Sequence, residues 1–177
     1  MRKVGLSLLI LFLLVILFRG PLYRALTHYE VVSYREVPTL PDAGLRAVSD
    51  SLSRLSADDE KVFVFRVQEY VADRLVFRAR NSGRTAAAIR AGGQANCVGY
   101  ARLLTDLLNR SAVIRASGLY ARSAVAKIFI LGFDVHQFTD SPFFRDHDVV
   151  EIRDGDGGVY RVLDPSLFDY TGVSWVE

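Results

Sequence analysis

The sequence predicts an α+β fold, and two changes of pattern along the 177-residue chain carry that prediction. Up to about residue 109, apolar residues recur at the spacing of helices, and beyond it the spacing shifts toward the alternation of strands. Helical segments followed by strands are typical of α+β folds. A third observation, an apolar stretch at the N-terminus, adds one transmembrane helix ahead of the folded domain.

The apolar stretch covers residues 4–18, which carry no charge and follow Arg2 and Lys3. A basic start before an apolar run is typical of signal peptides and signal anchors. Ala25 has a tyrosine two positions before it and makes a poor cleavage site, so we expect an uncleaved anchor at 1–20, with a cleaved signal as the alternative. The short basic tail predicts a single-pass membrane protein with its domain on the extracytoplasmic side.

Residues 21–41 contain three prolines and are expected to be a juxtamembrane connector to a single domain at 42–177. Within the connector, "EVVSYREV" is a candidate short strand. The domain then begins with a helix over 42–55, since its leucines and Val48 fall on one face.

A second helix is expected after Ser56, because Asp59 stands three residues later as in a helix-start motif. A strand at 62–67 is the competing interpretation of its valines and phenylalanines. We favour the helix, since the apolar pattern runs on past Arg74 without a turn signal.

The remaining elements follow from turn residues and periodicity. "NSGR" at 81–84 predicts a loop, "TAAAIRAGG" a short helix that ends at glycines, and 97–109 a longer helix. The later part predicts strands at "AVIRASGLYAR", "AVAKIFILGFDV", "HDVVEIR" and "VYRVLD", with "DGDGG" as a turn.

The only cysteine, Cys97, opens the helix at 97–109 and excludes an intramolecular disulfide. A helix N-terminus carries partial positive charge and unpaired N–H groups, and both favour a thiolate. Gln94 or Asn96 could donate a hydrogen bond to an oxyanion. The alternative is that Cys97 is a small apolar residue packed under its helix.

His147 and Asp164 fall on the last two predicted strands, where they could act with Cys97 as base and orienting acid. If they face each other across a hairpin, Glu151 lies opposite Tyr160 and a four-residue loop remains at 154–157. The alternatives are a histidine bonded to a neighbouring aspartate and an aspartate that only ends a strand before a proline.

His136 is a weaker candidate. It precedes the aromatic segment "FTDSPFF" at 138–144 and fits either an exposed loop or the rim of a pocket.

Three segments in this order resemble the transglutaminase-like superfamily. "GGQANCVGYARLLTDLLNRSAVIRASGLYAR" is similar to its cysteine helix and the strand after it, "HDVVEI" to its H-x-W-V-E-V strand, and "LDPS" to its D-P-T ending. The resemblance covers about residues 60–168, with Val149 where the family has tryptophan. It implies a papain-like α+β core: N-terminal helices, a catalytic cysteine at a helix start, then an antiparallel sheet. It also implies a triad of Cys97, His147 and Asp164.

The implied function is that of a membrane-anchored thiol enzyme acting on an amide or peptide bond through an acyl-enzyme, as a hydrolase or acyl transferase. The substrate would be a peptide, a protein or another amide, and Gln94 is the candidate oxyanion donor. The alternative is a catalytically idle transglutaminase-like domain that serves as a binding or assembly module at the membrane.

Composition excludes several other classes. The net charge is +2 and the arginines are dispersed, so no basic segment suits nucleic acid. One cysteine and three scattered histidines predict no metal site, and no motif predicts a cofactor.

Overall fold

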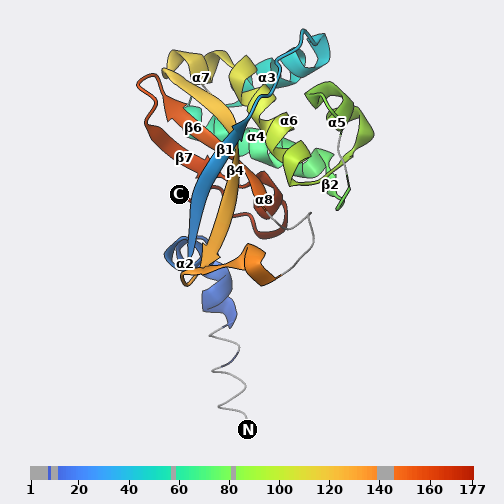
Figure 1. The fold of residues 1–177 in the computed structure, drawn as a ribbon. Helices are drawn as coiled ribbons and strands as arrows, with labels where there is room; N and C mark the ends of the chain where they lie inside the picture. The colour runs from blue at the N-terminus through green and yellow to red at the C-terminus, as the bar shows by residue number, and fades with distance from the viewer. Residues whose placement is uncertain (1–7, 9–11, 57–58, 81–82, 139–145) are drawn as a thin grey trace.

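The structure, a computed structural model, describes residues 8, 12–56, 59–80, 83–138 and 146–177 (Figure 1). Parts of three expected segments lie outside the described residues: 4–7 and 9–11 of the apolar stretch, 81–82 of the predicted loop, and 139–144 of the aromatic segment.

One antiparallel sheet runs through the molecule in the order β1-β4-β6-β7. Its strands are β1 (Thr27–Arg35), β4 (Leu119–Ile130), β6 (His147–Asp154) and β7 (Val159–Leu163). The two-residue strand β5 (Phe133–Asp134) pairs with β4, and β2 (Val76–Phe77) forms a separate parallel pair with β3 (Gln94–Ala95). β-branched and aromatic residues dominate these segments, as suits a pleated, half-buried surface.

The helices begin where a polar side chain can cap them. Asp42, Asp59, Thr85 and Asn96 each accept a backbone N–H from the first turn that follows. The helices are α2 (Arg19–Leu26), α3 (Ala43–Leu55), α4 (Glu60–Arg74), α5 (Ala86–Gly92), α6 (Cys97–Arg110), α7 (Ala112–Ala116), the 3₁₀ turn η1 (Val135–Phe138) and α8 (Pro165–Thr171).

Helices α3 to α6 gather on one side of the sheet (Figure 1). The larger core lies between them, where Leu104 and Leu108 of α6 pack with Val150 and Ile152 of β6, all without measurable exposure. The other face carries a smaller cluster that includes Val149 and Val162 and is joined by Val173 and Val176 of the C-terminal segment. The sheet is thus covered on both faces, which holds the start of α6 and the start of β6 in fixed positions.

The prediction of a transmembrane helix is corrected. Among the residues that the structure describes, no helix is both long enough and apolar enough to span a bilayer. The apolar run gives way to α2, whose Arg24 donates to the carbonyl of Trp175 and lies over its ring. The anchor at 1–20 and the single-pass membrane location with an extracytoplasmic domain are not supported.

The expected connector is also different. Residues 27–35 form β1, which pairs with β4 along its length and so belongs to the sheet. A strand therefore precedes α3 to α8, and the predicted order of helices first and then sheet is wrong. The candidate strand at "EVVSYREV" is confirmed in part, because residues 30–35 belong to β1, but its place in the main sheet was not predicted.

Two local predictions differ in detail. The helix expected after Ser56 is confirmed as α4, but its cap is Asp59, which accepts from the N–H groups of Lys61 and Val62. The segment expected as a strand at 112–122 divides into α7 and β4, because the Ser111 hydroxyl caps a short helix first.

Candidate active site

Cys97 is the first residue of α6, and the chain fixes it from both sides. On the N-terminal side of Cys97, β3 pairs with β2. On the C-terminal side, the N–H of Gly99 donates to the side chain of Asn96 at 3.2 Å, which caps the helix. Gly93, with φ of 65°, takes the left-handed conformation that ends α5 and turns the chain toward Cys97. Cys97 is 7 % exposed, so its thiol lies at the edge of the core rather than on an open surface.

His147 is the first residue of β6, and its ring lies beside Asp164. Its Nε2 lies 2.8 Å from Oδ2 of Asp164, and Cys97 is near enough to affect the pKa of the ring. Burial opposes protonation of the ring, but the charge and hydrogen bond of Asp164 and the contact with Cys97 outweigh it. The pKa of His147 therefore lies well above its ordinary value of 6.5.

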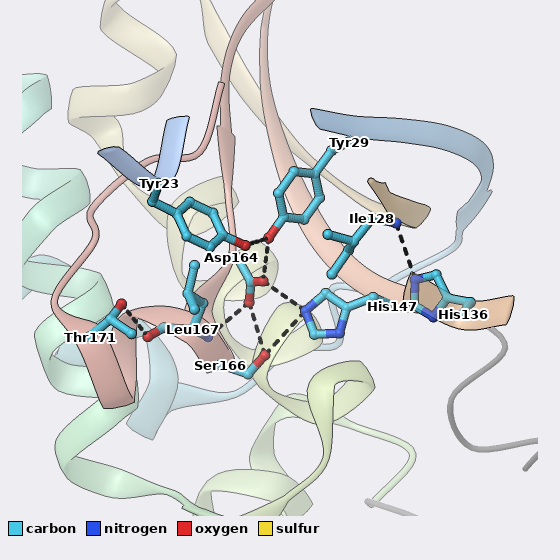
Figure 2. A network of polar contacts seen from close by, with 9 residues as sticks. All are labelled: Tyr23, Tyr29, Ile128, His136, His147, Asp164, Ser166, Leu167 and Thr171. Carbon is cyan, nitrogen blue, oxygen red and sulfur yellow. Dashed lines mark hydrogen bonds and ion pairs between the residues drawn. The ribbon is translucent and has the colours of Figure 1, made fainter. Parts of the chain in front are cut away.

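Asp164 caps α8, and both of its carboxylate oxygens are occupied (Figure 2). Oδ1 accepts the N–H of Leu167 and the hydroxyl of Ser166, each at 2.9 Å, and Oδ2 accepts from Tyr29 at 3.0 Å as well as facing His147. Burial favours the neutral acid, but His147 and these donors more than offset it and lower the pKa of Asp164. A buried carboxylate with this many donors stays charged.

The hairpin register differs from the one expected. Glu151 lies opposite Val162, two residues along from Tyr160, and Val150 lies opposite Leu163. A shift of two preserves the face on which each side chain points, so His147 and Asp164 remain on the same side. β7 ends at Leu163, and the first turn of α8 brings both Asp164 and Ser166 to the imidazole.

Sequence reasoning missed three side chains of this network: Tyr23, Tyr29 and Ser166. The hydroxyls of Tyr23 and Tyr29 lie 2.6 Å apart, and Tyr29 is buried in β1. Burial and the negative charge of Asp164 raise the pKa of Tyr29, which keeps its hydroxyl protonated as a donor. The alternation of "THYEV" would have placed Tyr29 on an inner face, had the segment been recognised as part of the sheet.

A cavity of about 300 Å³ opens at these residues. Its polar lining residues are Cys97, His136, Asp146, His147, Asp164 and Ser166, and aromatic and aliphatic side chains form the rest of its wall: Tyr23, Phe77, Ile128, Leu167 and Tyr170. His136 therefore lies at the cavity, where its Nε2 accepts the N–H of Ile128 at 3.1 Å. The thiol thus faces a largely apolar space with a few polar groups at one end, as is common for ligand sites.

Gln94 is not brought to this cavity. It is exposed on β3, and its side-chain carbonyl accepts a hydrogen bond from Arg80. The main-chain N–H groups at the start of α6 are the nearest alternative donors, because the first positions of a helix have no intrahelical partner.

Asp148 does not bond His147; Arg35 of β1 donates its Nε to Oδ2 of Asp148 at 2.6 Å. The alternative in which Asp148 holds His147 is therefore wrong, because the side chain of Asp148 bonds Arg35. Within the described ranges, no three His, Cys, Asp or Glu side chains lie together so as to hold a metal ion.

Comparisons with protein-family models, with curated proteins and with solved structures found no match. The papain- or transglutaminase-like core expected from the sequence is therefore corrected to the coarser description, an α+β fold with an antiparallel sheet. A proposal of function therefore rests on the site alone.

Proposed function

We propose that the protein is a thiol enzyme that cleaves or transfers an acyl group, with Cys97 as nucleophile, His147 as acid and base, and Asp164 as the residue that orients His147. The chemistry matches what the resemblance to the transglutaminase-like superfamily implies. The observation that carries the proposal is that the thiol, the imidazole and a fully bonded carboxylate line one cavity, with Nε2 of His147 2.8 Å from Oδ2 of Asp164.

The proposed reaction begins with a proton shift from the thiol to His147, which Asp164 favours because its negative charge stabilises the imidazolium. Since Nε2 faces Asp164, Nδ1 is the nitrogen left to exchange the proton with sulfur. The sulfur of Cys97 attacks the carbonyl carbon of an amide, and the oxygen becomes an oxyanion near the first N–H groups of α6.

The tetrahedral intermediate then collapses. The carbon–nitrogen bond breaks, His147 gives its proton to the leaving amine, and a thioester remains on Cys97. Water or a second amine gives a proton to His147 as it attacks the thioester carbon. The carbon–sulfur bond breaks and the thiol is regenerated, so hydrolysis and acyl transfer share every protein group.

The experiment is acylation by p-nitrophenyl acetate, a generic acyl donor. We expect a burst of p-nitrophenolate equal to the enzyme concentration and an acetyl group on Cys97 in the intact mass. Because the chain has one cysteine, the Cys97→Ala variant removes the only thiol and should abolish both signals. His28→Ala is a matched control for His147→Ala, since the His28 side chain is 68 % exposed and pairs with Glu177.

Failure of the burst in the wild-type chain would overturn the proposal. A catalytically idle domain that binds a partner would then be the better account of the same side chains.

A further inference from the structure

The apolar side of the cavity at Cys97 bears on which substrates the site accepts. Among the residues that the structure describes, its aromatic and aliphatic lining consists of Tyr23, Phe77, Ile128, Leu167 and Tyr170. These side chains come from α2, β2, β4 and α8, so segments that are distant in the sequence meet around one space. We call these five residues the apolar wall.

Most polar lining groups beside this wall already bond other parts of the protein. The hydroxyl of Tyr23 lies 2.6 Å from that of Tyr29, which donates to Asp164 (Figure 2). The hydroxyl of Ser166 also donates to Asp164, and Nε2 of His136 accepts a main-chain N–H. A ligand in the cavity therefore meets mainly the rings and aliphatic carbons of the wall.

The wall is held in place by contacts that need no ligand. The ring of Phe77 lies between two others, with its centroid 6.2 Å from that of Tyr100 and 6.4 Å from that of Tyr170. Tyr100 is buried, and its hydroxyl donates to Asp169 at 2.7 Å. Leu167 and Tyr170 are three residues apart on α8 and so lie on one face of it. Because the wall is formed in advance, a ligand does not have to order it.

The cavity has room for one large apolar group. Its volume is about 300 Å³. An apolar cavity of about 150 Å³ is already enough to bind benzene. A ring can therefore fit here together with the methylene and the carbonyl that join it to the sulfur of Cys97, whereas a long chain would exceed the space.

The polar side of the cavity suits the leaving group. Asp146 and His147 follow each other in the chain, both line the cavity, and both are partly exposed. In the proposed reaction the amine departs with a proton from His147. An amine in water becomes a cation, which a neighbouring carboxylate attracts. The apolar wall is then left for the acyl group, which stays on Cys97.

We propose that the apolar wall is an acyl pocket, and that the substrates carry an aromatic or compact aliphatic group on the acyl side of the scissile bond. The inference rests on the proposed function and names its substrate class. In the acyl-enzyme, the carbonyl carbon is bonded to Sγ of Cys97, and the apolar group lies against the wall. Each methylene that leaves water should raise kcat/KM about three- to four-fold.

Two isomeric thioesters separate the acyl side from the leaving side. S-methyl phenylethanethioate carries its ring on the acyl side, and S-benzyl ethanethioate carries the same ring on the leaving side. In both, the thiol of Cys97 attacks the carbonyl carbon, the carbon–sulfur bond of the thioester breaks, and the departing thiol takes the proton from His147. Consumption of each thioester gives kcat/KM, which is divided by its rate constant with N-acetylcysteine.

We expect the corrected kcat/KM to be roughly ten-fold higher or more for the isomer with the ring on the acyl side, because only that ring enters the pocket. Equal values, or a preference for the S-benzyl isomer, would overturn the proposal.

Tyr170→Ala removes part of the wall where the fold can tolerate the loss, since Tyr170 is 71 % exposed. The preference for the acyl-side ring should fall roughly five-fold, because a ring contact is lost. Phe133→Ala is the matched control: it removes a ring that is 67 % exposed on β5 and does not line the cavity. The control should keep the full preference. An unchanged preference in Tyr170→Ala would contradict the assignment of the wall.

Phe77→Ala tests the size of the pocket. The variant enlarges the cavity, so the ratio of kcat/KM for the 2-naphthylacetyl thioester to that for the phenylacetyl thioester should rise roughly ten-fold. Both substrates are measured on the same chain, so any loss of folded protein cancels in the ratio. A ratio equal to that of the wild type would mean that Phe77 does not limit the acyl group.

Binding without chemistry distinguishes failure of the pocket from failure of the enzyme. The Cys97→Ala chain is titrated by calorimetry with phenylacetamide and with succinamide, an amide of similar length with a polar end. Phenylacetamide should bind roughly ten-fold more tightly, with a negative change in heat capacity. Equal affinities would overturn the pocket.

The two proposals therefore fail in different ways. If the thiol is inert, the wild type consumes both thioesters no faster than Cys97→Ala does, yet the calorimetric comparison still decides the pocket. If only the pocket is misassigned, the wild type consumes both isomers in the ratio seen with N-acetylcysteine.

Discussion

Two buried aspartates, Asp164 and Asp148, lie close to His147 in the structure, and their pKa values are shifted in opposite directions. Asp164 is 2 % exposed and both of its oxygens are bonded, whereas Asp148 has no measurable exposure and its Oδ1 has no hydrogen-bond partner within the described residues. The pKa of Asp164 is lowered; that of Asp148 is raised by burial, although Arg35 opposes the rise. Both carboxylates are buried, but Asp164 has the charge of His147 beside it and several hydrogen-bond donors, whereas Asp148 has Arg35 opposed by the charge of Asp146.

The largest expected effect is that of Asp164→Asn on the acylation rate. The asparagine has no charge to hold the imidazolium and can turn its amide toward Nε2, which disfavours the productive tautomer. We expect the burst rate with p-nitrophenyl acetate to fall roughly a thousand-fold. A fall of less than ten-fold would mean that Asp164 only caps α8.

The pH dependence of stability sharpens the same contrast. Asp164 has a lowered pKa, so its contribution to the free energy of unfolding is present above its ordinary value of 3.8 and is lost as pH falls through the lower folded value. His147 has a raised pKa, so its contribution is present below 6.5 and is lost as pH rises through the higher folded value. The pair therefore stabilises most between about pH 4 and 6.5.

Urea unfolding of the wild type and of the His147→Gln, Asp164→Asn double variant checks this window. The difference in the free energy of unfolding should be largest near pH 5.5 and shrink at pH 3 and at alkaline pH. A difference that is constant across this range would show that the two groups do not act as a charged pair.

Tyr29→Phe tests whether a single hydrogen-bond donor to Asp164 contributes measurably to the stability of the fold. The change removes the hydrogen bond to the buried carboxylate and the one shared with the Tyr23 hydroxyl, and it should lower the free energy of unfolding by about 2 kcal/mol. Tyr34→Phe is the matched control, because the Tyr34 hydroxyl accepts a long hydrogen bond of 3.3 Å from Arg153 at an exposed site. Equal losses in the two variants would mean that burial of the bond is irrelevant.

Asp148→Asn should have the smallest effect. Its raised pKa means that the ionised form is held at a cost at neutral pH, and the variant relieves that cost while it weakens the bond to Arg35, whose side chain is partly solvated. We expect the free energy of unfolding at pH 7 to change by less than about 1 kcal/mol. A loss of unfolding free energy several times larger would mean that the charge of Asp148 stabilises the fold as that of Asp164 does.

The sequence predicted those parts of the site that depend on local order. Cys97 at a helix start follows from a polar cap before an apolar helical period, and the strand position of His147 follows from an alternating segment before a glycine-rich turn. Asp164 was expected on a strand but lies one residue past β7, where it caps α8. The hairpin register was predicted two residues off. One residue comes from the turn, since Arg153 pairs with Val159 rather than Gly158, and the other from a bulge between Ile152 and Arg153 that alternation does not reveal.

Other parts depend on contacts between distant segments. Tyr29 meets Asp164, and Arg35 meets Asp148, across more than a hundred residues of chain. No local pattern marks such partners once β1 is mistaken for a connector. The apolar run before Arg19 matched a membrane anchor in composition, but no helix in the described part of the chain is both long and apolar enough to span a bilayer.

The most direct test of the account is the rate of Cys97 alkylation by iodoacetamide as a function of pH, in the wild type and in His147→Ala. The account predicts rapid reaction below pH 7 in the wild type, because His147 holds the thiol proton, and a loss of at least ten-fold at pH 7 in the variant, where an ordinary thiol is only a few per cent ionised. Matching profiles for the two chains, with reaction only at the alkaline pH of an isolated thiol, would contradict it.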